Sequence, residues 1–312
     1  MSNSMKAELF LREMEFLQGR SRIEKINKGY SNDLKFIVEK NGVLYLLKAF
    51  ALEELTTKQA EYDAICQMQK FDVRCSKPIT IGVLPQENLG YMVLTYVEGE
   101  EATDALPTYS PDIQYTIGLE AGAELAKMHS WHAPAASESW HDRKLAKHMR
   151  YMDEYSNLPS EHRIKDEKRF LAFIDRHLHL MKGRPNVFQH DDFHVGNLII
   201  KQGEFAGVID FNRMDWGDPV HDFLKAGMFS SEVSIPFTIG QIKGYHGNRE
   251  PDEMFWTLYS LYLAMSIVSS VVWILKVKPE ELGIMRSKLE RVLEEHDHFQ
   301  STIPSWYLKE QL

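Results

Sequence analysis

The chain has 312 residues, of which 44% are hydrophobic, and a formal net charge of −9 at pH 7. This length is sufficient for one large domain or two lobes, and the apolar content supports a packed core. The negative charge argues against non-specific binding to nucleic acid, and it would tolerate a cationic small substrate.

Cysteine usage and the first residues bear on the compartment. Cys66 and Cys75 form no CxxC pair, so a disulfide framework and a zinc site are not expected and a reducing cytoplasm is favoured. Residues 1–10 contain no apolar stretch typical of a signal peptide, which also favours a cytoplasmic location. Residues 255–275 are uncharged and long enough to span a bilayer, but their serines and tyrosines favour a buried central helix.

The N-terminal third has the patterning of a small sheet. A helix is expected at residues 5–17, where apolar residues recur at helical spacing, and Gly19 is expected to end it. A second helix is expected at residues 52–69. Alternating apolar residues and turn signals predict strands at residues 23–26, 33–38, 43–50, 78–84 and 91–96.

From residue 111 onward helical patterning dominates. Helices are expected at residues 112–129, 140–155, 161–181, 220–229, 235–245, 251–276 and 279–298. Five strands with one helix, followed by a mostly helical half, predict a two-lobed α+β architecture. We expect residues 1–97 to form a nucleotide-binding lobe and residues 98–312 a helical lobe that carries the chemistry.

Lys48 lies within an apolar strand, where an unpaired ammonium group would be costly to bury. It should therefore have an acidic partner. The helix that follows offers Glu61 between its core-facing positions, and this pair matches the strand lysine and helix glutamate that position nucleotide phosphates in kinases.

Two other stretches are candidates for nucleotide contacts. The turn at residues 28–32 lies where a kinase-like fold places its phosphate-covering loop, with Ser31 and Asn32 as donors, although it has only one glycine. Backbone groups from Thr95 to Val97, at the expected hinge between the lobes, would meet the purine.

The polar cluster at residues 189–197 lies between apolar runs. The run after it, residues 198–200, is expected to be a short strand, and a second strand at residues 205–209 leads to Asp210. The spacing His-x-Asp-x-x-x-x-Asn, in His190, Asp192 and Asn197, is that of kinase-like phosphotransferases. Asp192 suits the task of orienting a substrate hydroxyl and taking its proton. Asn197 and Asp210 suit Mg²⁺, because hard cations prefer carboxylate and amide oxygens.

Together with these residues, the segments 208–211 and 216–222 resemble the aminoglycoside phosphotransferase family of the protein kinase-like superfamily. Segment 121–129 resembles the helix after the hinge in that family. The resemblance extends from Ile23 to Trp273 and is most specific between Gln189 and Asp222. It implies a small five-stranded antiparallel sheet lobe and a larger, mainly helical lobe.

By this resemblance Asp192 is the catalytic base, Asn197 and Asp210 are magnesium ligands, and Lys48 with Glu61 positions the phosphates. Asp218 and Asp222 would brace the catalytic loop, and His190 would hold it through its ring nitrogens. His194 is expected to face solvent. The family usually has glycine where Asp191 stands, and two adjacent acids could repel each other and raise one pKa.

The predicted function is transfer of the γ-phosphoryl group of ATP or GTP, with Mg²⁺, to a hydroxyl group of a small molecule. An aminoglycoside-like acceptor is the first choice, since acids such as Asp153, Glu154, Glu161 and Asp252 could meet a polycation or could be solvated. The alternative acceptor is a metabolic alcohol of the choline, methylthioribose or homoserine type. We expect a monomer or homodimer that binds neither membrane nor nucleic acid.

Two other classes of protein remain open. The pairs His190–Asp191 and His221–Asp222 would suit a transition metal in a phosphohydrolase, but that reading leaves Lys48 and Glu61 unexplained. A catalytically inactive kinase-like binding protein is conceivable because of Asp191 and the glycine-poor phosphate loop. Bound manganese or iron would favour the first class, and failure to bind Mg-ATP or Mg-GTP would favour the second.

Overall fold

The structure is a computed structural model that describes residues 14–27 and 33–309. Two compact units make up the chain. Unit 1 consists of residues 1–99 and 206–212, and unit 2 consists of residues 100–205 and 213–312. Most of the predicted opening helix lies outside the described residues, as does the turn at residues 28–32.

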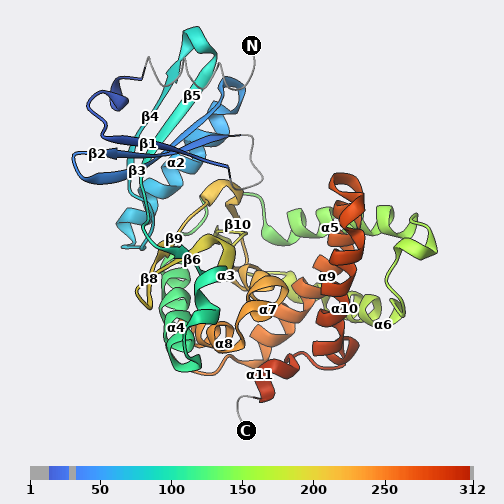
Figure 1. Ribbon diagram of the computed structural model, residues 1–312. Helices are drawn as coiled ribbons and strands as arrows, with labels where there is room; N and C mark the ends of the chain where they lie inside the picture. Colours follow the sequence, from blue (N-terminus) through green and yellow to red (C-terminus); the bar gives the residue numbers. More distant parts are fainter. Residues whose placement is uncertain (1–13, 28–32, 310–312) are drawn as a thin grey trace. The chain divides into compact units, whose positions relative to one another are not determined.

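Unit 1 contains a five-stranded sheet in the order β1-β2-β3-β5-β4, in which every neighbouring pair is antiparallel (Figure 1). The two-residue turn Asn41-Gly42 joins β2 to β3, and both of its residues adopt positive φ, as a tight hairpin requires. All five predicted strands are confirmed. The strands are β1 (Arg22–Ile26), β2 (Leu34–Lys40), β3 (Val43–Ala51), β4 (Pro78–Leu84) and β5 (Leu89–Thr95).

Helix α2 (Leu55–Lys70) of unit 1 has a buried side that includes two charged residues. Its buried residues recur at helical spacing, so they lie on one side of the helix. Glu61 is among them, and this side carries the carboxylate to Lys48 on β3. The buried residues are Lys58, Glu61, Ala64, Ile65 and Met68.

Residues 206–212 join unit 1 through the end of β9 (Glu204–Val208). The backbone amide of Val208 donates to the carbonyl oxygen of Arg74 at 2.9 Å, and Val208 forms a parallel bridge with Cys75. A Cβ atom at Gly207 would lie 2.9 Å from that same carbonyl, so this approach requires glycine. The division into lobes at residue 97 stays a prediction.

Unit 2 contains short strands on either side of the loop at residues 190–197. A two-stranded antiparallel ribbon pairs β7 (Val187–Gln189) with β10 (Asp215–Gly217), and the other sheet has the order β6-β8-β9. In the latter, β6 (Glu100–Glu101) pairs with β8 (Leu198–Lys201). β6, β7 and β10 were not predicted, because two or three residues are too few to show a periodicity.

Helices form the rest of unit 2, and α9 (Glu253–Val277) is its central element (Figure 1). It is long and apolar enough to cross a membrane by length and composition, but 72% of its most apolar window is buried within the protein. Helices α5, α6 and α10 pack against it, which agrees with the expected buried central helix. The other helices are α3 (Ala102–Ala105), α4 (Pro111–Met128), α5 (Trp140–Ser156), α6 (Lys168–His177), α7 (Ser231–Val233), α8 (Ile235–Tyr245), α10 (Leu282–Glu295) and α11 (Ser305–Lys309).

Helices α4 and α8 lie side by side at very short range (Figure 1). A Cβ atom at Gly118 of α4 would lie 2.1 Å from the carbonyl oxygen of Phe237, and one at Gly240 of α8 would lie 2.2 Å from that of Tyr115. The backbones therefore touch at positions where only glycine fits.

Two predicted helices differ from the structure. The helix expected at residues 161–181 is α only from Lys168 to His177, because Asp166 adopts a positive φ that an α-helix excludes. The helix expected at residues 220–229 is a 3-10 turn, Pro219–Phe223, followed by a π-helix, Ala226–Ser230. Single π turns are frequent at functional sites.

Candidate active site

The candidate catalytic loop, residues 190–197, runs from β7 to β8, and Asp222 accepts hydrogen bonds from its first two residues. The two carboxylate oxygens of Asp222 accept hydrogen bonds from the backbone amides of His190, at 2.9 Å, and Asp191, at 2.7 Å. Nε2 of His129 in unit 2 lies 3.0 Å from the same carboxylate. Asp222 is fully buried, so the predicted bracing role is confirmed.

Asp218 supports the loop less directly. Its carboxylate accepts hydrogen bonds from Arg184 (2.6 Å) and the Tyr262 hydroxyl (2.7 Å), and its backbone carbonyl accepts one from the Gln189 side chain at 2.6 Å. Gln189 immediately precedes the loop. A fully buried carboxylate with this many donors is a fixed anchor, so Asp218 is unsuited to reaction with a substrate.

Asp192, the predicted base, is surrounded by two cations and a histidine of unit 2. Its carboxylate lies 2.9 Å from Nζ of Lys225, 3.5 Å from Nε2 of His194 and 4.0 Å from Nε of Arg213. Burial alone would raise the pKa of Asp192, but His194 and Lys225 more than offset it and hold the pKa far below its usual range. Asp192 is therefore ionised at any physiological pH.

His194 does not face solvent as expected. Its side chain is only 20% exposed, and Nδ1 accepts a hydrogen bond from the backbone amide of Gly196 at 3.1 Å. This local bond turns the other ring nitrogen toward Asp192. The prediction was wrong because the sequence does not show that the loop folds back on itself in a 3-10 turn at residues 195–197.

Asn197 is oriented by the same carboxylate. Its Nδ2 donates to the backbone carbonyl of Asp192 at 2.9 Å and to the Asp192 carboxylate at 3.1 Å. These bonds fix the amide so that its carbonyl oxygen is left for another partner. That oxygen is the type of ligand that Mg²⁺ prefers, so the geometry of Asn197 fits the predicted role.

Asp191 adopts φ = 57°, in the left-handed region that glycine tolerates best and that aspartate visits more readily than most residues. This conformation explains why the family usually has glycine here. The Asp191 carboxylate lies 3.2 Å from Nδ1 of His221. Burial would raise the pKa of Asp191, but His221, Lys225 and Lys144 lower it to about 2.

The expectation that the adjacent acids would raise one pKa is therefore wrong. His221, Lys225 and Lys144 act on Asp191, and His194 and Lys225 act on Asp192, and these groups outweigh any mutual repulsion.

Unit 1 contains a buried cluster of charged groups around Lys48. Nζ of Lys48 donates to Glu61 at 2.7 Å, and Nζ of Lys58 lies 2.5 Å from Asp33 and 3.8 Å from Glu61. Burial would lower the pKa of Lys48, but Glu61, Asp210 and Asp33 raise it above the ordinary lysine value. The structure therefore brings Lys48 and Glu61 together as predicted, and Asp210 is near enough to act on Lys48.

Asp210 is the one carboxylate of this cluster with a buried oxygen, Oδ1, that has no hydrogen-bond partner among the described residues. Its backbone adopts φ = 67°, which is unusual for a residue other than glycine. An unpartnered buried carboxylate oxygen is costly unless a cation binds it. Asp210 therefore fits the predicted role of magnesium ligand.

The remaining predicted nucleotide contacts are only partly described. Ser31 and Asn32 lie outside the described residues. The backbone amides of Thr95 and Tyr96 are occupied by the carbonyl oxygens of Lys77 and Leu44, and the Thr95 hydroxyl accepts from the amide of Lys77. These bonds occupy two of the three backbone amides of the segment, and the purine contact at Thr95 to Val97 stays a prediction.

Sequence reasoning missed several residues that shape the site. Lys225 pairs with Asp192, Arg184 anchors Asp218, and Lys144 contacts His221, with Nζ 2.6 Å from Nε2. Lys225 could have been noticed as the one charge in the apolar run 223–229. Lys144 lies far from the motifs in sequence, and Arg184, five residues before Gln189, lies in no pattern that marks it.

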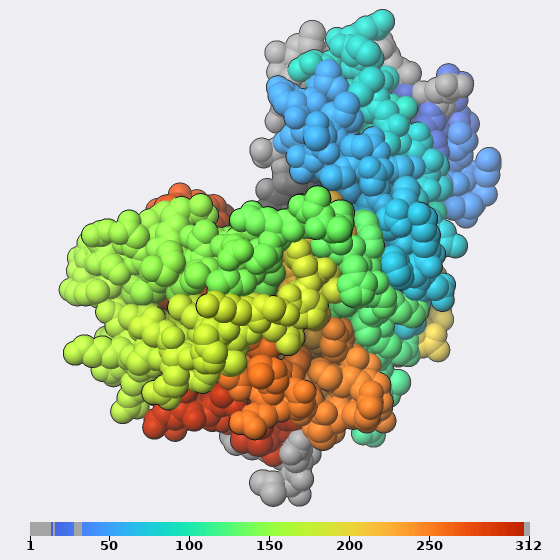
Figure 2. Space-filling view, turned by 180° about the vertical axis from the view of Figure 1, so that it is seen from behind, coloured from blue at the N-terminus to red at the C-terminus, as the bar shows by residue number. Residues whose placement is uncertain are grey.

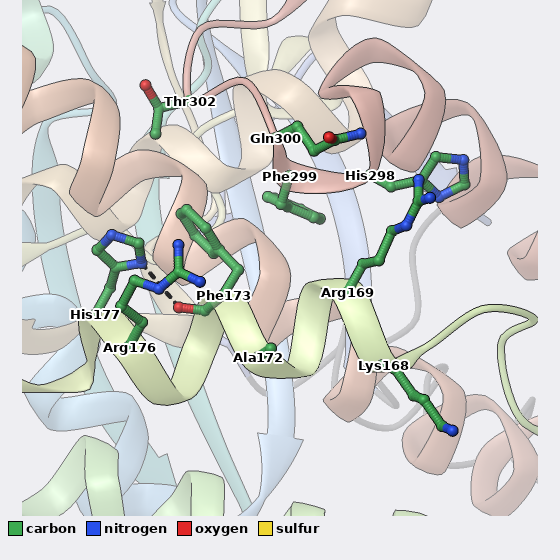
Figure 3. A pocket seen from close by; sticks show the side chains of 10 residues that line it. All are labelled: Lys168, Arg169, Ala172, Phe173, Arg176, His177, His298, Phe299, Gln300 and Thr302. Atoms are coloured by element: carbon green, nitrogen blue, oxygen red, sulfur yellow. Dashed lines mark hydrogen bonds between the residues drawn. The ribbon is translucent and has the colours of Figure 1, made fainter.

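A surface pocket of about 760 Å³ lies elsewhere in unit 2 and shares no residue with the catalytic loop. Figure 3 shows the side chains of α6 along one side of it and those of residues 298–302 along the other. Arg176 and His177 lie next to Phe173 there, and His177 contacts the Phe173 carbonyl at 2.8 Å. It has no acidic lining residue, so it is not the catalytic site. The lining residues are Lys168, Arg169, Ala172, Phe173, Arg176, His177, His298, Phe299, Gln300 and Thr302.

The hydrolase alternative finds no support in the part of the chain that the structure describes. No group of three histidine, cysteine or acidic side chains is placed there to hold a metal ion. Asp222, which that alternative requires as a ligand, has both oxygens engaged by backbone amides.

Comparisons with known proteins agree with this geometry. A family model described as the phosphotransferase enzyme family matches residues 22–255. A search of curated proteins found no match.

Several solved structures share the fold at low sequence identity. The GDP complex of wild-type aminoglycoside 2'-phosphotransferase-IIIa has a TM-score of 0.71 at 12% identity, covering 93% of this chain and 98% of that one. ADP-bound aminoglycoside phosphotransferase APH(2'')-Ib has a TM-score of 0.63 at 15% identity, covering 98% and 99%. The gentamicin complex of APH(2'')-IIa has a TM-score of 0.62 at 15% identity, covering 93% and 96%. The fold is thus the kinase-like fold of these enzymes.

Proposed function

Because the chain belongs to the phosphotransferase enzyme family, we propose that it transfers the γ-phosphoryl group of ATP or GTP to a hydroxyl group of a small molecule with Mg²⁺. Similar structures contain GDP or ADP. They support a nucleotide as the donor, and the choice between ATP and GTP belongs to the proposal.

The charge balance of the cluster in unit 1 carries this proposal. Lys48 and Lys58 face three carboxylates, those of Glu61, Asp33 and Asp210, so the cluster has one negative charge more than its lysines neutralise. The excess falls on Asp210, whose Oδ1 has no partner among the described residues. A divalent cation would compensate it, and Lys48 would remain to position the phosphates.

Each residue then has a separate task. Asp210 and Asn197 would hold Mg²⁺, which neutralises charge on the phosphate oxygens. Asp192 accepts a hydrogen bond from the acceptor hydroxyl and orients it toward the γ-phosphorus. As the new oxygen–phosphorus bond forms, the bond to the leaving nucleoside diphosphate breaks and the hydroxyl proton passes to Asp192.

The low pKa of Asp192 agrees with a mainly orienting role. A strongly ionised carboxylate is a weak proton acceptor, but a loose phosphoryl-transfer transition state requires little proton removal before the phosphoryl group moves. Lys225 and Asn197 hold the carboxylate in place for this task.

The acceptor is the finer part of the proposal. The similar structures are of aminoglycoside phosphotransferases, and the first prediction from sequence was an aminoglycoside-like acceptor. The acids thought able to meet a polycation are partly engaged elsewhere, since Glu154 pairs with Lys276 and Asp252 caps α9. This observation favours the second candidate, a metabolic alcohol.

The test is phosphoryl transfer from labelled ATP and, separately, GTP to aminoglycosides, choline, methylthioribose, homoserine and other small alcohols. Asp192→Asn should keep Mg-nucleotide binding and lose at least about 100-fold in turnover, because it removes the base and leaves the proposed metal ligands. Asp210→Ala should weaken Mg-nucleotide binding itself, as measured by calorimetry.

Two results would count against the proposal. Full turnover in Asp192→Asn would remove the assigned base, and unchanged nucleotide affinity in Asp210→Ala would remove the assigned metal ligand. If the wild-type protein binds neither Mg-ATP nor Mg-GTP, the inactive binding protein becomes the better explanation.

A further inference from the structure

Lys144 of α5 is an unusually placed cation next to the catalytic loop. Its Nζ lies 2.6 Å from Nε2 of His221, whose Nδ1 lies 3.2 Å from Asp191, the neighbour of the catalytic Asp192. Lys144 therefore connects α5 to the loop through one imidazole ring. A neutral His221 can accept a hydrogen bond from the ammonium group at Nε2 and keep its Nδ1–H on the side of Asp191.

Burial and charged neighbours act on both members of this contact. Burial and Lys144 lower the pKa of His221, which keeps the ring neutral as this contact requires. Burial and the neighbouring Lys147 lower the pKa of Lys144 to about 8, although Asp191 and Asp215 act in the opposite direction. The carboxylates around Lys144 thus do not compensate its charge fully.

Lys144 has no carboxylate within ion-pair distance among the described residues. Its ammonium group has three N–H donors, and the contact with His221 uses one of them. The nearest acids are committed to other cations: Asp215 pairs with Arg143 at 2.9 Å, and Asp191 is nearest His221. Lys144 as a residue is partly exposed, and its ammonium group retains two donors for a ligand.

The wider charge distribution has the same sign. The first two turns of α5 carry Arg143, Lys144 and Lys147 against the single acid Asp142. Figure 2 shows the segment that contains α5 (green) on the surface of unit 2. The catalytic Asp192 is itself faced by Lys225, His194 and Arg213. Among the described residues, Lys144 and Lys147 have no carboxylate within ion-pair distance, which favours an anion over a polycation beside them.

We propose that Lys144, positioned by His221, binds an anionic group of the acceptor, so that the substrate is an alcohol that carries a carboxylate or phosphate. This inference rests on the proposed function and specifies its substrate class. A fixed ammonium group that contacts such an anion would hold the acceptor while Asp192 orients its hydroxyl.

Direct binding at Lys144 can be measured without turnover. The rate of Lys144 acetylation by an activated acetate ester at pH 8, followed by mass spectrometry, should fall when gluconate or glycerol 3-phosphate is added. Their neutral counterparts, sorbitol and glycerol, should have no effect, and kanamycin should have none either. The lowered pKa makes Lys144 reactive at this pH, which gives the assay its sensitivity.

Turnover supplies the second measurement. Labelled phosphoryl should pass from Mg-ATP or Mg-GTP to hydroxy acids or phosphorylated alcohols in preference to neutral alcohols and aminoglycosides. Lys144→Gln should raise the KM for the anionic acceptor about tenfold or more, since a hydrogen bond to a charged group has about that effect, and should leave Mg-nucleotide binding unchanged. Lys144→Arg should retain most of the affinity. Arg150→Gln, an exposed charge on the same helix, is the matched control and should behave as wild type.

The outcomes separate this inference from the proposed function. Labelling of aminoglycosides or neutral alcohols alone, or an unchanged KM in Lys144→Gln, overturns the anionic acceptor and leaves the kinase intact. Protection of Lys144 by gluconate or glycerol 3-phosphate without any transfer supports the anion site and overturns the kinase. Absence of both protection and transfer overturns the anion site as well.

Discussion

Replacing Asp222 by alanine tests the view that this buried carboxylate holds the catalytic loop in place. The substitution removes the acceptor for the backbone amides of His190 and Asp191, at 2.9 and 2.7 Å, and for Nε2 of His129, at 3.0 Å. Each buried donor left unsatisfied costs about 1–3 kcal/mol. The relieved desolvation of the carboxylate offsets part of this sum, so unit 2 should lose about 3–5 kcal/mol of stability.

Tryptophan fluorescence is a selective probe for this experiment. All six tryptophans of the chain lie within the residue ranges of unit 2, so urea unfolding followed by their emission reports that unit alone. Asp222→Ala should lower the midpoint with an unchanged slope. The control is Asp252→Ala, which removes a helix cap whose carboxylate accepts one amide bond at 2.8 Å and should cost about 1 kcal/mol.

Hydrogen exchange at single amides tests the same role locally, beside the urea unfolding of the whole unit. In Asp222→Ala the amides of His190 and Asp191 should exchange their hydrogens faster relative to the rest of unit 2. If Asp222→Ala loses no more stability than Asp252→Ala, or if these two amides keep their protection, the bracing role of Asp222 is refuted.

Three further predictions follow from the packing and the buried groups. Gly118→Ala should destabilise unit 2 by about 1–3 kcal/mol through a clash with α8. Gly283→Ala on α10, where the added carbon meets open space, should be neutral or slightly stabilising. Urea unfolding compares the two variants, and equal midpoints would contradict the close contact of α4 and α8. Burial lowers the pKa of His148 and of His296 to about 4, below the value of about 6.5 in the unfolded chain. Between these pH values the unfolded state binds more protons than the folded state. The stability of unit 2 should therefore fall as the pH drops from about 6.5 to about 4, by up to about 1.4 kcal/mol per pH unit for each histidine. His148→Gln should reduce that slope, and a slope identical to wild type would rule out its contribution. Glu61→Gln should weaken Mg-nucleotide affinity in calorimetry because Lys48 loses its charged partner, and an unchanged affinity would separate the pair from phosphate binding.

Asp191 illustrates how one departure from a family pattern can acquire a separate use. The position requires a left-handed backbone, which accounts for glycine in the family, and aspartate can adopt it. Its carboxylate then becomes available to His221 and, through that ring, connects the loop to α5. Asp191, which made a catalytically inactive protein conceivable, therefore belongs to the contacts on which the inference of an anionic acceptor rests.

The strands, most of the helices and the candidate catalytic residues could be predicted from the sequence. Strand alternation in unit 1 and helical spacing in α4, α5, α8 and α9 depend on local burial, which is visible in a linear pattern. The spacing of Asp192 and Asn197 is equally local, since both lie on one loop. Even the pair of Lys48 and Glu61 could be predicted, because a charge in an apolar strand requires a partner close by.

The groups that surround those residues could not be predicted from the sequence, because the fold brings them together. Lys225, Arg184 and Lys144 come from different parts of the chain, and no pattern in sequence links them to Asp192, Asp218 and His221. The lowered pKa of Asp192 and the short distance between His194 and Asp192 result from the way the fold brings these groups together. Electrostatic interactions depend on distance in space, whereas periodicity depends on distance along the chain, so the reaction class could be inferred from sequence and the charge of the acceptor site could not.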